Sequence, residues 1–513
     1  MAAHGLDGQA FDLVVLGTGL EESIIASEAA SAGKSVLHVD RNPYYGGSYA
    51  CFSPSRLVEW AVDHRDRSQV PRVEVVLGAP GSDAPAFVIG DVREAAESAA
   101  AATAVGTVDD RRVAETLGRL APYAAGSGDM AEPCAADALA RLLQNDREYM
   151  LELAPKAALC RGGLVELLID TGIGEFVQFM GVEQTYLVRA GAAAATIPQS
   201  KEDVFASTAL SLIEKRKLMR LLTTVGGTDD QYAAAVGECG DTEFSQFLQE
   251  RFRLDGMLLD AVRYAVARVA FGESISAREG CERVRRYVTS MGRYGRMAYL
   301  CALYGGGSEI AQAFCRTCAV AGGTYILSED VGAIEAAGDG AGVSVALAHG
   351  TVLAKHVVMG PGYAAAGAVR VAATVSRAIC VLDRPALGDD TTAAASYVGE
   401  RGVVSLLYMT QATRTVPKGQ SVLYAWTDGT LAETRELLGC ALDATRGDTA
   451  TPLLTVFMEM HTLAADAPSG SSILVTGSPD ATIDYGSAVA AAQRVLATGL
   501  AIQAEAPATS HAT

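Results

Sequence analysis

The chain has 513 residues, half of them apolar, which is enough for a large core and favours two domains over one. Acidic residues exceed basic ones by 60 to 41, and the formal net charge of −19 disfavours nucleic acid and anionic surfaces as partners unless a local basic patch is present. The composition therefore indicates a partner that is basic or apolar, or a small molecule.

The ends of the chain carry no targeting signal that we recognise. Residues 1–8 lack the basic and apolar regions of a secretory leader, and the final PATSHAT is not a prenylation box. We also find no uncharged apolar stretch of roughly 18 residues, the length that a spanning helix requires. The chain is therefore expected to be cytoplasmic.

Residues 11–50 predict the start of a parallel sheet. The apolar runs 14–16 and 36–39 are typical of buried strands, and a glycine turn and a helix-like stretch lie between them. A strand, a helix and a strand in this order form a βαβ unit, whose two strands run parallel in one sheet.

The turn of this unit carries two of the three glycines of the dinucleotide fingerprint G-x-G-x-x-G. Gly17 and Gly19 are present, and Asp40 stands about twenty residues further on, where the acid that binds a ribose is expected. Glu22 replaces the third glycine, with Glu21 beside it, so two carboxylates stand where a pyrophosphate would bind. The sequence therefore favours a chain that keeps the dinucleotide fold without the cofactor over an active flavin site.

Residues 62–135 differ in composition from their surroundings. The stretch begins with charged residues and continues with the alanine-rich REAAESAAAATAVGTVDDRR. Low complexity of this kind predicts an insertion, partly flexible, on an otherwise compact domain.

Residues 200–272 predict a small helical domain. Ser200 and Asp203 fit a helix cap, and apolar residues follow at helical spacing, first up to about residue 222 and then in a second block at 242–271. We therefore expect an all-α domain at 200–272, inserted into an α/β domain made of residues 1–199 and 273–513.

The C-terminal part returns to mixed α/β character. Residues 322–338 and 342–360 alternate apolar and polar side chains, as β-hairpins do, and residues 471–500 predict the last strand and helix of the parallel sheet.

No catalytic or metal-binding set stands out in the sequence. Cys315 and Cys318 have CxxC spacing, but no second cysteine pair or histidine pair accompanies them, as a zinc site requires. Their apolar neighbours favour two buried thiols over a redox pair. The seven histidines are spread along the chain and fall in no metal or nucleophile motif.

Several stretches together carry a resemblance to one family. They are GTGLEESII, LHVDRNPYYGG, LIEKRKLMRLL, the long MGRYGRMAYLCALYGGGSEIAQAFCRTCAVAGGTYIL and the C-terminal strand and helix. In this order they resemble the GDI/Rab escort protein family over most of the chain outside 62–135. The extra length at 62–135, GGSYACFSPSRLVEW and FCRTCAV are similar to its escort branch.

The resemblance implies a fold and a function. The fold would be an α/β domain of the flavoprotein type, with a mixed sheet, plus a small inserted all-α domain. The function would be that of component A of Rab geranylgeranyltransferase, an accessory factor without catalytic residues of its own. Such a factor binds GDP-bound Rab GTPases, unprenylated and prenylated. It presents them to the transferase α/β heterodimer and delivers the product in transient contact with membranes.

Matching the family motifs residue by residue implies a Rab-binding platform. Its members here are Tyr45, Arg293, Glu309, Arg316 and Ile326. A tyrosine and an acid–arginine pair are able to hold a partner's backbone and side chains with charge-assisted hydrogen bonds. Without the resemblance to the family, Glu309 and Arg316, two helical turns apart, would be interpreted as solvated or as paired with nearby residues.

Two departures from the family pattern concern these sites. LYGGGSE has one residue more than the family's version, which puts the position of Glu309 in question. Tyr287 stands where escort proteins use a phenylalanine to dock the transferase. A tyrosine fills an apolar pocket if its hydroxyl reaches a partner or solvent.

The helical domain is implied to hold the geranylgeranyl chain. A C20 chain is wholly apolar and gains about 0.8 kcal/mol per buried CH₂. The candidate lining residues are Phe252, Met257, Leu258, Val262 and Val266. Taken singly, each of these residues is better explained as part of the core of the domain than as part of a prenyl site.

Two alternatives remain open at this point. One is a recycling GDP-dissociation inhibitor of the same family, which extracts prenylated Rab without serving the transferase. The other is an FAD-dependent oxidoreductase, which the GxG turn and Asp40 would suit.

Overall fold

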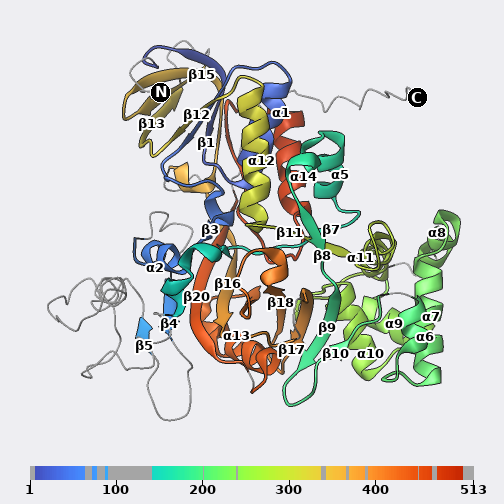
Figure 1. Ribbon diagram of the computed structural model, residues 1–513. Helices are drawn as coiled ribbons and strands as arrows, with labels where there is room; N and C mark the ends of the chain where they lie inside the picture. The colour runs from blue at the N-terminus through green and yellow to red at the C-terminus, as the bar shows by residue number, and fades with distance from the viewer. Residues whose placement is uncertain are drawn as a thin grey trace, which may run out of the picture.

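The computed structural model describes eleven segments of the chain. They are residues 6–63, 72–77, 87–89, 141–199, 201–237, 241–336, 342–365, 369–387, 391–448, 450–464 and 471–500. Figure 1 shows an α/β part at the top, a second sheet below it and a helical region at one side. The predicted insertion at 62–135 and the predicted cap at Ser200 lie largely outside the described residues.

The first sheet has seven strands and contains the predicted βαβ unit. Its order is β12-β2-β1-β15-β14-β13, and β21 also pairs with β15. The five strands β12, β2, β1, β15 and β21 run parallel to one another. The strand β14 runs antiparallel to β15, and β13 runs antiparallel to β14. Their bounds are Ala10–Leu16 (β1), Val36–Asp40 (β2), Thr324–Leu327 (β12), Val331–Ala336 (β13), Val343–Leu347 (β14), Gly350–Met359 (β15) and Ile473–Val475 (β21).

Helices cover one face of this sheet. They are α1 (Leu20–Ser31), α5 (Gly163–Asp170), α12 (Gly306–Val320) and α14 (Gly486–Arg494). Figure 1 shows α1 between α12 and α14, and nearly every residue of α1 is buried. Ile24, Ile25 and Phe314 lie in the core between the helices and the sheet.

The second sheet has nine strands in the order β10-β9-β17-β18-β19-β16-β20-β4-β5. The helices α2 (Pro54–Asp63) and α13 (Leu431–Arg446) lie on its opposite faces. The strand bounds are Arg72–Leu77 (β4), Phe87–Ile89 (β5), Gln184–Arg189 (β9), Ala195–Thr196 (β10), Arg370–Leu382 (β16), Ala393–Val398 (β17), Val403–Thr410 (β18), Ser421–Asp428 (β19) and Pro452–Ala464 (β20).

Two small sheets join the larger parts. One pairs Cys51–Phe52 (β3) with Leu151–Glu152 (β6), and the other places Tyr299–Ala302 (β11) between Ala158–Leu159 (β7) and Phe179–Gly181 (β8). The strand β11 of the second small sheet is the element that directly precedes α12 in the chain.

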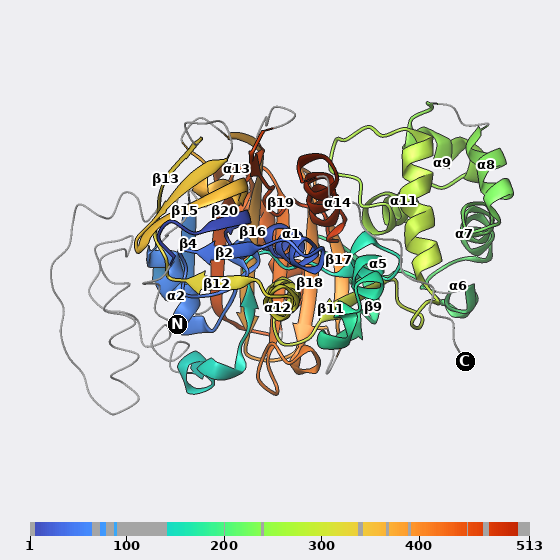
Figure 2. The same cartoon turned by 90° about the horizontal axis from the view of Figure 1, so that it is seen from above.

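The helical region lies beside the sheets, as Figure 2 shows. Its helices are α6 (Lys201–Ala206), α7 (Leu212–Val225), α8 (Asp229–Gly237), α9 (Phe244–Phe252), α10 (Gly256–Asp260), a π-helical turn at Ala261–Val266 and α11 (Ala277–Ser290). A capping box of Ser211 and Glu214 starts α7. The helices continue to Ser290, past the predicted boundary at 272, and the division into domains stays a prediction. No helix among the described residues is long and apolar enough to cross a bilayer.

The predictions for the strands were right in part. The strand and helix at 471–500 are β21 and α14, as expected. The stretch 322–338 is not one hairpin, because β12 pairs in parallel with β2 while β13 pairs with β14. Within the predicted insertion, β4 and β5 extend the second sheet, since Val73 and Val75 alternate with polar residues and are buried.

Candidate functional site

The turn between β1 and α1 has the shape of a dinucleotide seat, but glutamate side chains fill it. Gly17 has φ +99°, and Gly19 caps α1. A Cβ on Gly19 would meet a carboxyl oxygen of Glu22, so this side chain covers the backbone that a pyrophosphate would approach. Thr476 donates a hydrogen bond to Glu22, and the amide of Gly477 donates to Glu21 at 2.7 Å.

Burial changes the charge of these two glutamates. It raises the pKa of Glu21 to about 8, with the neighbouring Glu22 adding to the effect, and it raises the pKa of Glu22 to about 7. Both carboxyl groups are therefore substantially protonated near neutral pH. The two carboxyl groups therefore repel a pyrophosphate less than two fully ionised carboxylates would. The stronger obstacle to binding is that the Glu22 side chain occupies the place of the pyrophosphate.

Asp40, the candidate ribose acid, already accepts hydrogen bonds from within the chain. Its carboxylate accepts from the Thr18 amide at 2.8 Å, the Thr18 hydroxyl at 2.6 Å, the Asn42 amide at 2.8 Å and the Tyr363 hydroxyl at 3.0 Å. The Tyr363 ring also lies 3.2 Å from a Cβ built on Gly17. The residues at this turn therefore do not fit a dinucleotide.

The same four bonds give Asp40 a structural role that is open to measurement. Asp40→Ala is expected to lower the free energy of unfolding by about 2 kcal/mol, because buried donors lose their acceptor. Chemical denaturation gives the value. Asp170→Ala, at the exposed end of α5, is the control. A loss for Asp40→Ala no larger than that of the control would contradict the structural role.

The predicted partner-binding residues gather around α12 and the edge of the first sheet. Tyr45 is half-buried in the loop that follows β2, with its ring centroid 6.3 Å from that of Tyr325 on β12. Ser308, in the first turn of α12, donates to the carbonyl of Tyr45 at 3.5 Å. Ile326 is the next residue on β12 and pairs with Val39 on β2. Tyr45 and Ile326 therefore flank one sheet edge beside the start of α12.

Glycines allow α12 to begin close to buried side chains. A Cβ on Gly306, whose φ is +51°, would meet the carboxylate of Glu152, and one on Gly307 would lie 2.8 Å from the Tyr49 ring. The longer LYGGGSE turn thus places Glu309 in the first turn of α12. Glu309 is half-buried, and desolvation raises the pKa of its carboxyl group.

The two predicted arginines have different surroundings. Arg316 is exposed on α12, with its guanidinium 4.7 Å from the ring centroid of Phe176. Arg293 follows α11 and forms an ion pair with Glu166 on α5, and it donates to the carbonyl of Cys160 at 2.8 Å. This pairing lowers the pKa of Glu166. The structure therefore leaves Arg316 accessible and engages Arg293 within the chain.

Two exposed aromatic residues near these positions were missed by the sequence reasoning. Phe176 is 46% exposed beneath Arg316, and Tyr304 is 48% exposed just before the glycines that start α12. Tyr304 also has φ +65°, a left-handed conformation that is uncommon for a residue with a side chain. The signal in the sequence that could have identified Tyr304 was its position directly before three glycines. We name Tyr45, Phe176, Tyr304, Glu309 and Arg316 together the α12 platform.

Tyr287, the predicted transferase contact, is buried. It is 3% exposed on α11, and its hydroxyl lies 3.3 Å from that of Thr185. Its ring packs against Tyr299 with centroids 5.8 Å apart. A contact of Tyr287 with a partner stays a prediction that requires α11 to move.

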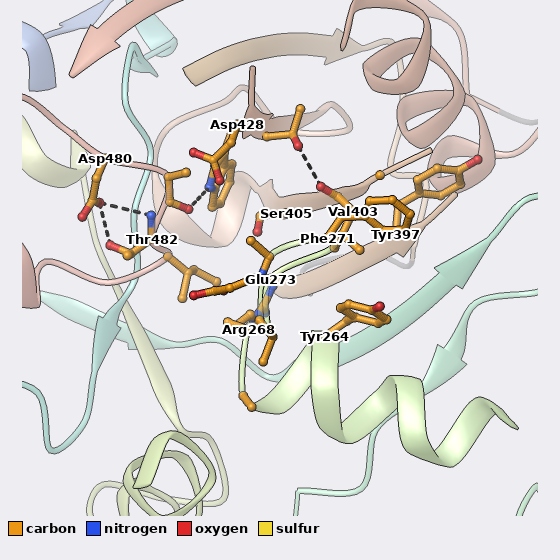
Figure 3. Close-up of a pocket in the computed structure, with 18 of the residues that line it drawn as sticks. Tyr264, Arg268, Phe271, Glu273, Tyr397, Val403, Ser405, Asp428, Asp480 and Thr482 are labelled. Atoms are coloured by element: carbon orange, nitrogen blue, oxygen red, sulfur yellow. Dashed lines mark hydrogen bonds between the residues drawn. The ribbon is translucent and has the colours of Figure 1, made fainter. Parts of the chain in front are cut away.

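Most of the candidate prenyl-binding residues form the core of the helical region. Phe252, Leu258 and Val262 are buried there, Val266 packs against them, and Met257 is 55% exposed. A cavity of about 1520 Å³ lies between this region and the second sheet. Figure 3 shows Tyr264 on one side of it and Asp428 and Asp480 on the other. Of the five candidates, only Val266 lines this cavity, so a prenyl site at the others requires the helices to part.

The two CxxC cysteines are buried thiols. Cys318 is fully buried, Cys315 is 6% exposed, and burial raises the pKa of Cys315 to about 11. Within the part of the chain that the structure describes, no group of three histidine, cysteine or carboxylate side chains is arranged to hold a metal ion.

Comparison with known proteins finds relatives along most of the chain. The family model described as "GDP dissociation inhibitor" matches residues 7–71 and 135–414. A Drosophila melanogaster protein named "Rab proteins geranylgeranyltransferase component A" is 27% identical, over 94% of this chain and 87% of that protein. "Component A 1" of Caenorhabditis elegans is 30% identical over 69% of this chain and 66% of its own length. A "Probable secretory pathway GDP dissociation inhibitor 1" of Schizosaccharomyces pombe is 26% identical over 73% and 69%.

Solved structures share the fold. A Rab GDI from Plasmodium falciparum superposes with a TM-score of 0.67 at 18% identity, covering 97% of this chain and all of that one. An oxidoreductase from Methanosarcina mazei gives a TM-score of 0.54 at 13% identity, covering 94% and 99%. The predicted fold class, an α/β fold of the flavoprotein type with a helical addition, is confirmed.

Proposed function

The chain belongs to the GDP dissociation inhibitor family, and on that basis we propose that it is a Rab escort protein. In this role it binds GDP-bound Rab GTPases, presents them to Rab geranylgeranyltransferase and delivers the prenylated product to membranes. The observation that carries the proposal is the match to a component A protein over 94% of this chain. Within this role the chain itself supplies no catalytic residue, and it works in the cytoplasm with transient membrane contact.

The α12 platform supports the Rab-binding part of the proposal. An exposed arginine above an aromatic ring and a half-buried acid lie on one helix, beside a half-buried tyrosine. Aromatic and arginine side chains of this kind commonly dominate protein interfaces. In this proposal Arg293 and Ile326 contact the Rab at the margins of the platform. Arg293 does so by replacing its ion pair with Glu166 by one with the Rab.

Reconstituted prenylation tests the proposal. The purified chain, added to Rab geranylgeranyltransferase, geranylgeranyl diphosphate and an unprenylated GDP-bound Rab, is expected to raise the rate of lipid transfer at least tenfold. Transfer is measured by incorporation of labelled lipid, and serum albumin at the same concentration is the control. A chain that binds the Rab but leaves the rate unchanged is not an escort protein.

A recycling GDP-dissociation inhibitor is the second candidate. The Schizosaccharomyces pombe relative and the Plasmodium falciparum structure favour it. Such a protein extracts prenylated Rab from membranes and does not stimulate transfer, so the same reconstitution separates the two. The filled seat at Gly19 and the saturated Asp40 speak against an FAD-dependent oxidoreductase, for which the purified protein would be yellow.

A further inference from the structure

Three large apolar side chains are exposed on the consecutive helices α6 and α7 of the helical region. Phe205, near the end of α6, is 65% exposed, and Leu212 and Ile213, the first residues of α7, are 77% and 68% exposed. The ammonium group of Lys215 donates to the carbonyl of Phe205 at 2.7 Å, which joins the two helices. We name Phe205, Leu212 and Ile213 the apolar edge.

The local fold holds the apolar edge outside the core. The capping box of Ser211 and Glu214 fixes the first turn of α7, while Leu218 and Leu221 of the same helix point into the core of the helical region. Leu212 and Ile213 are therefore presented to the surroundings by a rigid turn. Large apolar side chains that are held exposed in this way commonly mark an interaction site.

Met257 is a further exposed apolar side chain of the helical region and one of the candidate prenyl residues. Lys217 on α7 pairs with Asp255, which precedes α10, with 3.0 Å between the ammonium nitrogen and the carboxylate, and this ion pair links the two helices. Met257 follows in α10 and is 55% exposed, and its neighbour Leu258 lies in the helical core. The helical region thus carries both the exposed apolar side chains and the residues expected to line a lipid site.

The charge around the apolar edge differs in sign from that of the whole chain. Residues 201–220 contain five basic and three acidic side chains, against a net charge of −19 overall. Arg216 and Arg220 are exposed and lie one turn apart on the same face of α7. Exposed apolar residues flanked by basic ones are typical of surfaces that enter the interface of an anionic bilayer.

We propose that the apolar edge docks the protein on anionic phospholipid membrane. In this arrangement Phe205, Leu212 and Ile213 enter the headgroup region, and Arg216 and Arg220 lie over the lipid phosphates. The proposal rests on the proposed function in one respect, because the helical region that docks is also the one expected to hold the prenyl chain. Docking itself requires no Rab.

Vesicle binding of the full chain tests the proposal. Co-sedimentation is measured with vesicles of phosphatidylcholine alone and of phosphatidylcholine mixed with phosphatidylserine. The wild-type chain is expected to bind the mixed vesicles and to lose binding at high salt. Leu212→Gln with Ile213→Gln should weaken binding at least tenfold, on the order of fivefold per removed side chain. Arg216→Gln with Arg220→Gln should weaken it by about fivefold per charge.

The control variant and a second assay keep the outcomes apart. Val320→Gln removes a side chain that is 83% exposed at the end of α12, and it should bind vesicles like the wild type. No binding of the wild type to the mixed vesicles overturns the proposal, and so does unchanged binding of Leu212→Gln/Ile213→Gln. The proposal is also overturned if this variant binds vesicles but no longer stimulates prenylation in solution, because the edge then contacts a protein. Failure of every variant and the wild type in the prenylation assay refutes the escort function and leaves the vesicle result standing.

Discussion

Arg316→Glu is expected to weaken the binding of a GDP-bound Rab roughly a hundredfold. The guanidinium lies over the Phe176 ring and is exposed on α12. A partner's carboxylate or carbonyl group is therefore able to reach it. Reversing its charge removes a charge-assisted bond and adds repulsion, together about 3 kcal/mol. Titration of the chain into a Rab loaded with a fluorescent GDP measures the change.

The control for this variant makes the same charge change elsewhere. Arg401→Glu alters an arginine that is 82% exposed between β17 and β18, where it pairs loosely with Glu436 at 3.7 Å. Both variants should unfold at the temperature of the wild type, because neither side chain is buried. Equal Rab affinities for the two variants would show that α12 does not form the binding surface.

The free energy of unfolding is expected to fall as the pH rises from about 5 to about 9. Burial raises the pKa of Glu21 to about 8 and that of Glu22 to about 7 in the folded chain, while both carboxyl groups titrate near 4.5 when unfolded. The folded state therefore binds more protons within this range, so stability is fully present below the unfolded pKa and is lost through the folded one. Glu21→Gln with Glu22→Gln should raise stability at the alkaline end by on the order of 4 kcal/mol.

Urea denaturation at a series of pH values measures this effect. The double variant should show a flatter dependence, though not a level one, because burial also raises the pKa of Glu152 to about 8. Glu436→Gln, at an exposed position, should follow the wild type. If the double variant loses stability with pH as steeply as the wild type, the two glutamates are not buried as uncharged groups.

The N-terminal unit was predictable because its signals are local. The apolar runs at 14–16 and 36–39 sit on either side of a GxG turn, and parallel strands buried on both faces require such runs. The strand β4 was not predicted, because its neighbours in sequence are low in complexity and its pairing partner β20 lies far along the chain. Alternation over six residues is too short a signal to outweigh that composition.

The candidate site was predictable only as far as the family motifs reach. They indicated Glu309 and Arg316, but Phe176 comes from another segment and becomes visible as a neighbour only when the chain is folded. The pairing of Arg293 with Glu166 depends in the same way on contacts between distant residues. Side-chain burial, which decides the protonation of Glu21, has no counterpart in the sequence.

The position of β4 and β5 has a consequence for how this protein is able to evolve. They are the outermost strands of the nine-stranded sheet, on the side of the molecule away from the helical region (Figure 1). A segment attached at such a margin lengthens or shortens at little entropic expense, since loop closure depends only weakly on length. Changes of length within residues 62–135 that spare β4 and β5 would therefore leave the nine-stranded sheet and the α12 platform in place.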